Sequence, residues 1–429
     1  MNRFKKNILL FCCLVASTAT FAQSTTSSPY SQFGLGILNG PSLPQNRALG
    51  GVSAGLRRPG TYSNINLGNP ASYSAIELTT FDIGLYSGLA NLSKGNVSEN
   101  NFNASLSHVV FAVPISRQSA LSFGLVPYSS LGYRSRVRTE LDTNTVDYIY
   151  RGEGGLSKAY LGYGIQIGKH LSIGANASYI FGKLENDQDT EFPEDFSFVN
   201  SRTQRSNSIG GLNSDLGVQY FTNISKNVKL TLGYTTTLST NLKSTERTVS
   251  TRYTTDAQGN ESVALDTSFF DERATMKLRL PSMHTVGFAL ERSNKWFFGV
   301  DAYMGNWKDY AIGGVNQGLQ NSSGIAVGWQ ITPDVNSVSN YFALVDYRLG
   351  FRYDKTYINI ANQDINQAAL TLGFGFPLPS NRTTFYKINF AAELGNRGTL
   401  EQNLVRERFV NFHLGFTIND RWFQRYKFD

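Results

Sequence analysis

Ser282 and His284 are the residues whose types and spacing come closest to an active site in this sequence. Residues two positions apart on an extended strand lie on one face, so the imidazole could take the serine proton, as in hydrolases. Some membrane-embedded phospholipases place a serine and a histidine on their wall in this way. However, no acidic residue is placed to complete a triad, and a polar pair after Pro281 is also typical of an irregular strand. We therefore expect no catalytic residues and no enzyme activity.

Other patterns for catalysis or for ligand binding are absent from the sequence. It contains no glycine-rich phosphate loop, no His-Glu-x-x-His pair and no calcium-loop spacing, and its four histidines are scattered. Its two cysteines, Cys12 and Cys13, are adjacent and lie close to the N-terminus. We predict no cofactor, no metal ion and no disulfide in the mature chain.

The first 22 residues have the layout of a secretory signal peptide. Arg3, Lys5 and Lys6 form a basic start, residues 8–16 form an apolar run, and Ala22 ends a stretch of small and polar residues. The run is much shorter than the roughly 20 residues that a membrane-spanning helix needs. Cleavage after Ala22 removes both cysteines and lowers the formal charge of +7 by three. The remaining charge is too small to predict a nucleic-acid partner.

The rest of the chain has the two-residue period of β-strands. In the last predicted strand, apolar residues alternate with small or polar ones: Val410, Phe412, Leu414, Phe416 and Ile418 against Asn411, His413, Gly415 and Thr417. The mean hydropathy of −0.25 is that of a soluble protein, yet the chain contains 29 Phe and 22 Tyr. A barrel wall explains both properties, because a transmembrane strand shows lipid only every second residue.

Fourteen such segments follow one another, and their connections alternate in length. Tight turns such as residues 168–170 alternate with long polar stretches at 137–149, 185–206 and 244–272, which is typical of outer-membrane barrels. We predict an all-β fold, a 14-stranded antiparallel transmembrane β-barrel over residues 78–419, with both termini and a 420–429 tail in the periplasm. The predicted strands span residues 79–92, 100–116, 119–136, 150–168, 170–184, 207–223, 227–243, 273–291, 295–309, 321–331, 341–354, 365–378, 383–395 and 407–419.

Residues 23–77 do not alternate and form a separate segment ahead of the barrel. Their glycines and small residues allow the backbone to pack closely. They also carry apolar residues that a free polar tail would lack, namely Phe33, Leu35, Ile37, Leu49, Leu56, Ile65 and Leu67. We therefore predict that this segment folds into the lumen as a plug, or hatch.

Three short motifs in this segment resemble those of a known family. Arg47–Gly51 reads RALGG, Ser53–Leu56 reads SAGL and Asn69–Ser72 reads NPAS. In these motifs and in its layout, the chain resembles the FadL-type transporters of long-chain fatty acids and aromatic hydrocarbons, in particular their divergent branch in Bacteroidetes. The resemblance implies a Gram-negative outer-membrane barrel that admits hydrophobic molecules through a lateral opening. It also implies that Asn69, Pro70 and Ala71 act as the hinge of the hatch.

Charged residues on the predicted lumen face form a second candidate site. Asp346, Arg348 and Arg352 share one face of a strand, and Lys387 and Glu393 share a neighbouring part of the wall. These residues could line a polar channel or hold the hatch. Mutual compensation of charges inside a narrow barrel would give the same pattern, and we favour that interpretation.

Two functions fit these features best, and a third, a porin for polar solutes, is disfavoured by the predicted plug. The leading hypothesis is passive uptake of hydrophobic, fatty-acid-like molecules, with a hydrophobic ligand and membrane lipid as partners. The alternative is a non-transporting subunit of an outer-membrane secretion or protein-insertion machine, in which residues 419–429 and 244–272 contact other outer-membrane proteins. An apolar tunnel with a gap in the wall would favour transport, whereas a polar, sealed lumen would favour the subunit.

Overall fold

The computed structural model describes residues 27–57, 63–141, 144–194, 198–256, 258–272, 275–379 and 384–422. The first half of the wall contains β2 (Thr79–Lys94), β3 (Val97–Ser116), β4 (Ser119–Leu141), β5 (Asn144–Ile167), β6 (Leu171–Glu191), β7 (Asn200–Ser225), β8 (Val228–Thr237) and β9 (Thr240–Tyr253). The second half contains β10 (Asp266–Glu272), β11 (Met276–Leu280), β12 (Met283–Arg292), β13 (Trp296–Gly305), β16 (Ser322–Ile331), β17 (Asp346–Ile360), β18 (Gln363–Pro377), β19 (Thr384–Gly398) and β20 (Arg406–Asp420).

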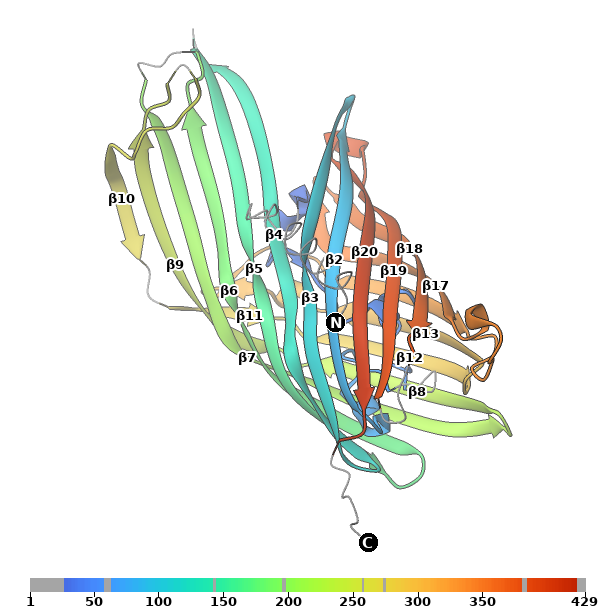
Figure 1. Ribbon diagram of the computed structural model, residues 1–429. Coiled ribbons are helices and arrows are strands. Elements are labelled where there is room, and N and C mark those ends of the chain that lie inside the picture. The colour runs from blue at the N-terminus through green and yellow to red at the C-terminus, as the bar shows by residue number, and fades with distance from the viewer. Residues whose placement is uncertain are drawn as a thin grey trace, which may run out of the picture.

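These strands form one antiparallel sheet that closes where β2 pairs with β20 (Figure 1). Two strands of the wall are interrupted: β8 and β9 continue one another, and so do β10, β11 and β12. Counted in this way the wall has fourteen strands, and the predicted 14-stranded antiparallel barrel is confirmed. Two short strands, β14 (Ala311–Ile312) and β15 (Val315–Asn316), and the 3-10 helix η3 (Trp307–Asp309) connect β13 to β16.

The outer face of the wall is apolar, and its residues alternate with inward-facing ones. On β18, Leu370, Leu372 and Phe374 are 46%, 42% and 37% exposed, whereas Ala369 and Thr371 between them are each 2% exposed. Exposed leucines and aromatic residues recur in this way on most wall strands. A water-soluble protein would not leave such a band uncovered, whereas the lipid-facing band of a transmembrane barrel has this composition.

The wall is much taller on one side than on the other. Strands β4, β5, β6 and β7 have 23, 24, 21 and 26 residues, although about ten suffice to cross a bilayer. Their ends continue as a blade of paired strands beyond the rest of the barrel (Figure 1). The prediction of loops at 137–149, 185–206 and 244–272 is therefore wrong over most of those ranges. Strands outside the membrane need no apolar face, so hydrophobic periodicity did not reveal them.

The N-terminal segment lies between opposite walls of the barrel. It contains the helices η1 (Pro29–Gln32), α2 (Pro44–Arg47) and η2 (Pro70–Ala75) and the short strand β1 (Ile37–Leu38). Helix η2 contacts β5, β6 and β7, while α2 contacts β18, β19 and β20 on the other side. We call residues 27–57 and 63–76 the hatch. No helix in the described part of the chain is long and apolar enough to span a membrane.

The wall is not paired along its whole height between β3 and β4. These strands pair from Ser116–Ser119 up to Val109–Leu125, and no further. Within the described residues, β3 above this point pairs only with β2, and β4 pairs only with β5 and with β1 of the hatch. Figure 1 shows β4 leaning away from β3 here. We call the two facing edges, residues 97–108 and 126–141, the seam.

Candidate functional site

Asn69 caps the helical turn that leads from the hatch into the barrel. Its Oδ1 accepts a hydrogen bond from the backbone N–H of Ala71 at 3.0 Å, and its Nδ2 donates to the carbonyl oxygen of Ala54 at 2.8 Å. Pro70 lies against the wall so closely that a Cβ on Gly174 would be 2.3 Å from its carbonyl carbon. The structure thus brings Asn69, Pro70 and Ala71 together in one buried, anchored turn. Their role as a hinge stays a prediction.

Two buried charged residues outside the predicted site join the hatch to the wall. Asp301 on β13 accepts hydrogen bonds from the backbone N–H groups of Ser53 and Ala54 at 2.7 and 2.8 Å. Arg57 of the hatch donates to the Ser172 hydroxyl of β6 at 2.9 Å. Burial lowers the pKa of the Arg57 guanidinium to about 10, so it stays charged at neutral pH. Both contacts depend on long-range docking, which no sequence pattern reports.

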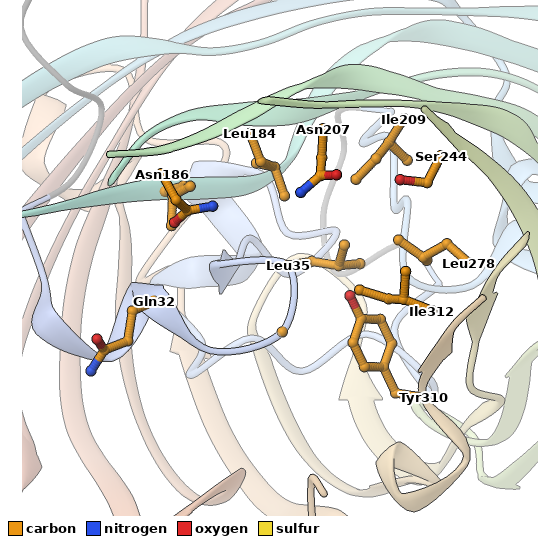
Figure 2. Close-up of a pocket in the computed structure, with 12 residues that line it drawn as sticks. Gln32, Leu35, Leu184, Asn186, Asn207, Ile209, Ser244, Leu278, Tyr310 and Ile312 are labelled. Carbon is orange, nitrogen blue, oxygen red and sulfur yellow. The ribbon is translucent and has the colours of Figure 1, made fainter. Parts of the chain in front are cut away.

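Apolar clusters close the lumen on both sides of its middle. Towards the long hairpins, Leu35 of the hatch is fully buried and points into a ring of wall residues (Figure 2): Leu184, Ile209, Leu278 and Ile312. The space left there is about 50 Å³, and Trp307 stacks on Tyr357 beside it at 4.4 Å between ring centroids. Towards the short turns, hatch residues pack on the wall in two further clusters around Leu49 and Tyr73.

A chamber of about 940 Å³ lies between these closures. It reaches the seam, where Asn103 and Ser105–His108 of β3 and Val126–Ser130 of β4 line it. Its lining includes seven acidic and six basic side chains: Glu153, Glu185, Asp215, Asp301, Asp354, Glu393 and Glu407 against Arg47, Lys158, Lys183, Arg352, Lys355 and Arg397. The chamber therefore contains many charged groups that almost balance in charge, set among apolar lining residues such as Leu38, Val126 and Phe409.

The predicted lumen-facing set falls into two ion-pair clusters. Asp346 accepts from Arg348 at 2.6 Å and from Lys387 at 2.5 Å, and all three are buried. Arg352 pairs with Glu393 at 2.5 Å at the edge of the chamber. Each acidic group thus faces a basic one, which is the arrangement expected from charge compensation. A role for these residues in a polar pathway stays a prediction.

Ser282 and His284 do not form a catalytic pair in the structure. Nδ1 of His284 lies 2.9 Å from the Tyr234 hydroxyl and 3.1 Å from the Thr236 hydroxyl. The Ser282 hydroxyl accepts instead from the side-chain amide of Asn306 at 2.9 Å. In the described residues no group of three His, Cys, Asp or Glu side chains could hold a metal ion.

A closed 14-stranded antiparallel barrel is a FadL-like fold. The toluene transporter TodX of Pseudomonas putida aligns with 90% of this chain and 100% of its own at 13% identity, with a TM-score of 0.59. A Pseudomonas aeruginosa FadL homologue aligns over 90% and 100% at 12% identity, with a TM-score of 0.58. The CymD monoaromatic hydrocarbon channel aligns over 91% and 99% at 13% identity, with a TM-score of 0.55.

At these identities the likeness is one of fold, and it confirms the FadL-like barrel. The family itself follows from the sequence: the chain belongs to the BamG family, whose model matches residues 4–429. No curated protein sequence matches the chain. The predicted Bacteroidetes branch stays a prediction.

Proposed function

We propose that this protein is a membrane-embedded subunit of an outer-membrane machine for protein insertion or secretion. Its barrel then acts by contacting other polypeptides, and solutes do not pass along its axis. The barrel would lie in the outer membrane with its short turns in the periplasm and its long hairpins outside the cell.

The lumen is the observation that carries this proposal. Apolar clusters of hatch and wall residues fill it on both sides of the chamber, and charged groups are spread through the lining of the chamber between them. Lys158, for example, pairs with Asp215 at 2.6 Å. A hydrocarbon chain in this space would remove water from such groups without offering hydrogen bonds in return, which is unfavourable.

The seam supports a second candidate, which is passive passage of hydrophobic or amphipathic small molecules through the side of the barrel. The chamber reaches the seam, and Leu106 at the edge of β3 is 50% exposed on the apolar outer face. The solved structures that share this fold are named as toluene transporters and monoaromatic hydrocarbon channels. An amphipathic molecule could place its polar group in the chamber and its apolar chain in the membrane.

Depletion of the protein in its own host separates the two candidates. Folded outer-membrane barrels would be counted by their heat-dependent shift in gel mobility, and uptake of radiolabelled oleate would be measured in the same cells. We expect folded barrels to decline within a few generations, followed only later by any change in oleate uptake. Normal barrel assembly with an early loss of oleate uptake would reject the subunit and favour the channel.

A further inference from the structure

Within the described residues, the edge of β3 beside Leu106 has no strand partner other than β2, and it lies at the depth of the apolar band. Leu106 of β3 lies opposite Leu85 of β2, which lies opposite Leu414 of β20. All three side chains are exposed on the lipid-facing side. The edge of β3 beside Leu106 therefore lies in the hydrocarbon layer, where backbone N–H and C=O groups need partners because no water is present.

The hatch demonstrates that the edge of β4 can pair with an extended chain. Ile37 pairs with Ser130 as part of β1. The backbone N–H of Ser28 donates to the carbonyl oxygen of Gly132 at 2.9 Å, while the hydroxyl of the adjacent Ser27 donates to the side chain of Asn103 on β3 at 3.3 Å. At this level a single stretch of polypeptide thus reaches both edges of the seam.

Beyond Gly132 the edge of β4 continues without such cover. Within the described residues, β4 from Tyr133 to Leu141 pairs only with β5, and residues 134–141 are exposed. Both the N–H and the C=O of Gly132 point to the seam side, because they bond Ser31 and Ser28 of the hatch. Since strand residues alternate, residues 134, 136 and 138 present their backbone groups to the same side.

We propose that the seam binds an extended β-strand of a partner outer-membrane polypeptide, which pairs with the edge of β4 beyond Gly132. This inference rests on the proposed subunit function and names the contact that the subunit would use. Only a peptide backbone supplies donors and acceptors at the spacing of a strand edge. A lipid chain or a hydrocarbon would fill the space but leave the backbone groups unpaired.

The two faces of the seam define the sequence of that strand. On the outer side, its neighbours along β4 beyond Gly132 are basic: Arg134, Arg136 and Arg138, all exposed. On the inner side they are Tyr133, Ser135 and Val137. The bound strand should therefore alternate acidic residues, which face the arginines, with small polar residues.

Disulfide trapping with a synthetic peptide tests this contact on the full mature chain in lipid nanodiscs. The probe is a ten-residue peptide of alternating Glu and Ser with one Ser replaced by Cys. Single cysteines would be placed in turn at residues 133–138, in a mature chain that has no cysteine of its own. Gln188→Cys is the matched control, because Gln188 lies in register with Ser135 but two strands away from the seam.

We expect cross-linking to alternate along β4, with maxima among Tyr133, Ser135 and Val137, since Tyr133 packs towards the lumen. The strongest position should exceed Gln188→Cys by at least about tenfold. Methylation of alternate backbone nitrogens of the peptide should lower the yield by about tenfold, because it removes several hydrogen bonds.

Uniform cross-linking along residues 133–138, or an equal yield with the methylated peptide, would overturn the proposal. Displacement of the peptide by equimolar oleate would also overturn it and identify the seam as a lipid site. The depletion experiment stays independent of these outcomes. If the peptide pairs but depletion leaves barrel assembly intact, the strand site stands and the subunit function fails.

Discussion

A disulfide that ties the hatch to the wall should distinguish a channel from a scaffold. Ser74 of η2 and Ser172 of β6 are buried, and their Oγ atoms are 2.8 Å apart. The double variant Ser74→Cys/Ser172→Cys replaces each hydroxyl by a thiol of similar size, and the sequence's two native cysteines, Cys12 and Cys13, both lie in the predicted signal peptide. When oxidised, the variant cannot move η2 away from the wall.

The expected stability change follows from two opposing contributions. The residues are 98 positions apart, and a cross-link closing a loop of this length stabilises by about 4.7 kcal/mol in the chain-entropy model. Arg57 donates to both hydroxyls, at 3.0 and 2.9 Å, and each such bond to a charged group contributes about 1.5–3 kcal/mol. The reduced variant should therefore lose about 3–6 kcal/mol, and the oxidised variant should lie within about 2 kcal/mol of the wild type.

Unfolding in lipid vesicles, with and without reductant, measures the stability. Complementation of depleted cells measures function, with Ser74→Ala/Ser172→Ala as the control that loses the hydroxyls but cannot cross-link. We expect the oxidised variant to restore barrel assembly as well as the wild type does. If it restored assembly only after reduction, hatch movement would be required and the static scaffold would be refuted. A channel would lose oleate uptake on oxidation and regain it on reduction.

Three further substitutions test the wall, the hatch contact and the lumen charges. Leu370→Arg should destabilise the barrel in vesicles by about 2–4 kcal/mol, because Leu370 faces lipid. An unchanged midpoint of urea unfolding would show that the outer face of β18 lies in water. Gly174→Ala should cost at least about 1–3 kcal/mol, because the new Cβ would clash with Pro70, and protease should then cut the hatch faster. Lys387→Ala should cost about 1.5–3 kcal/mol by removing one partner of Asp346, yet still complement depletion; failure to do so would give the pair a functional role.

The wall could be predicted because every second residue of a transmembrane strand faces lipid and is therefore apolar. In the last strand, Leu414 is exposed and His413 is buried, as their alternation predicts. The ends of β4 to β7 were not predicted because both of their faces can be polar in water, so their sequence shows no apolar alternation. There the pairing depends on cross-strand contacts such as Arg138 with Asp147 at 2.8 Å, and these are visible only once the register is known.

The candidate site was predictable only where its residues share neighbouring strands. Asp346 and Lys387 lie on strands separated by one other strand, so parity alone placed them on the same side of the wall. Arg57 and Asp301 act across the lumen on segments far apart in the sequence, and periodicity has no access to such docking. The seam left a single weak signal, Pro127, which lies two residues beyond the last β3–β4 pair and has no N–H for a ladder.

The seam is longer than a lateral opening for small molecules needs to be. Exposed strand edges are usually shortened, covered or charged, because they invite pairing with other chains. Here the described residues of the hatch cover β4 from Tyr128 to Gly132, and the same edge then runs on to Leu141 as the border of the blade. A small hydrophobic molecule needs only a short gap at the depth of the membrane. An edge that continues from the chamber to beyond the bilayer offers a strand-length template, which fits a partner polypeptide better than a solute.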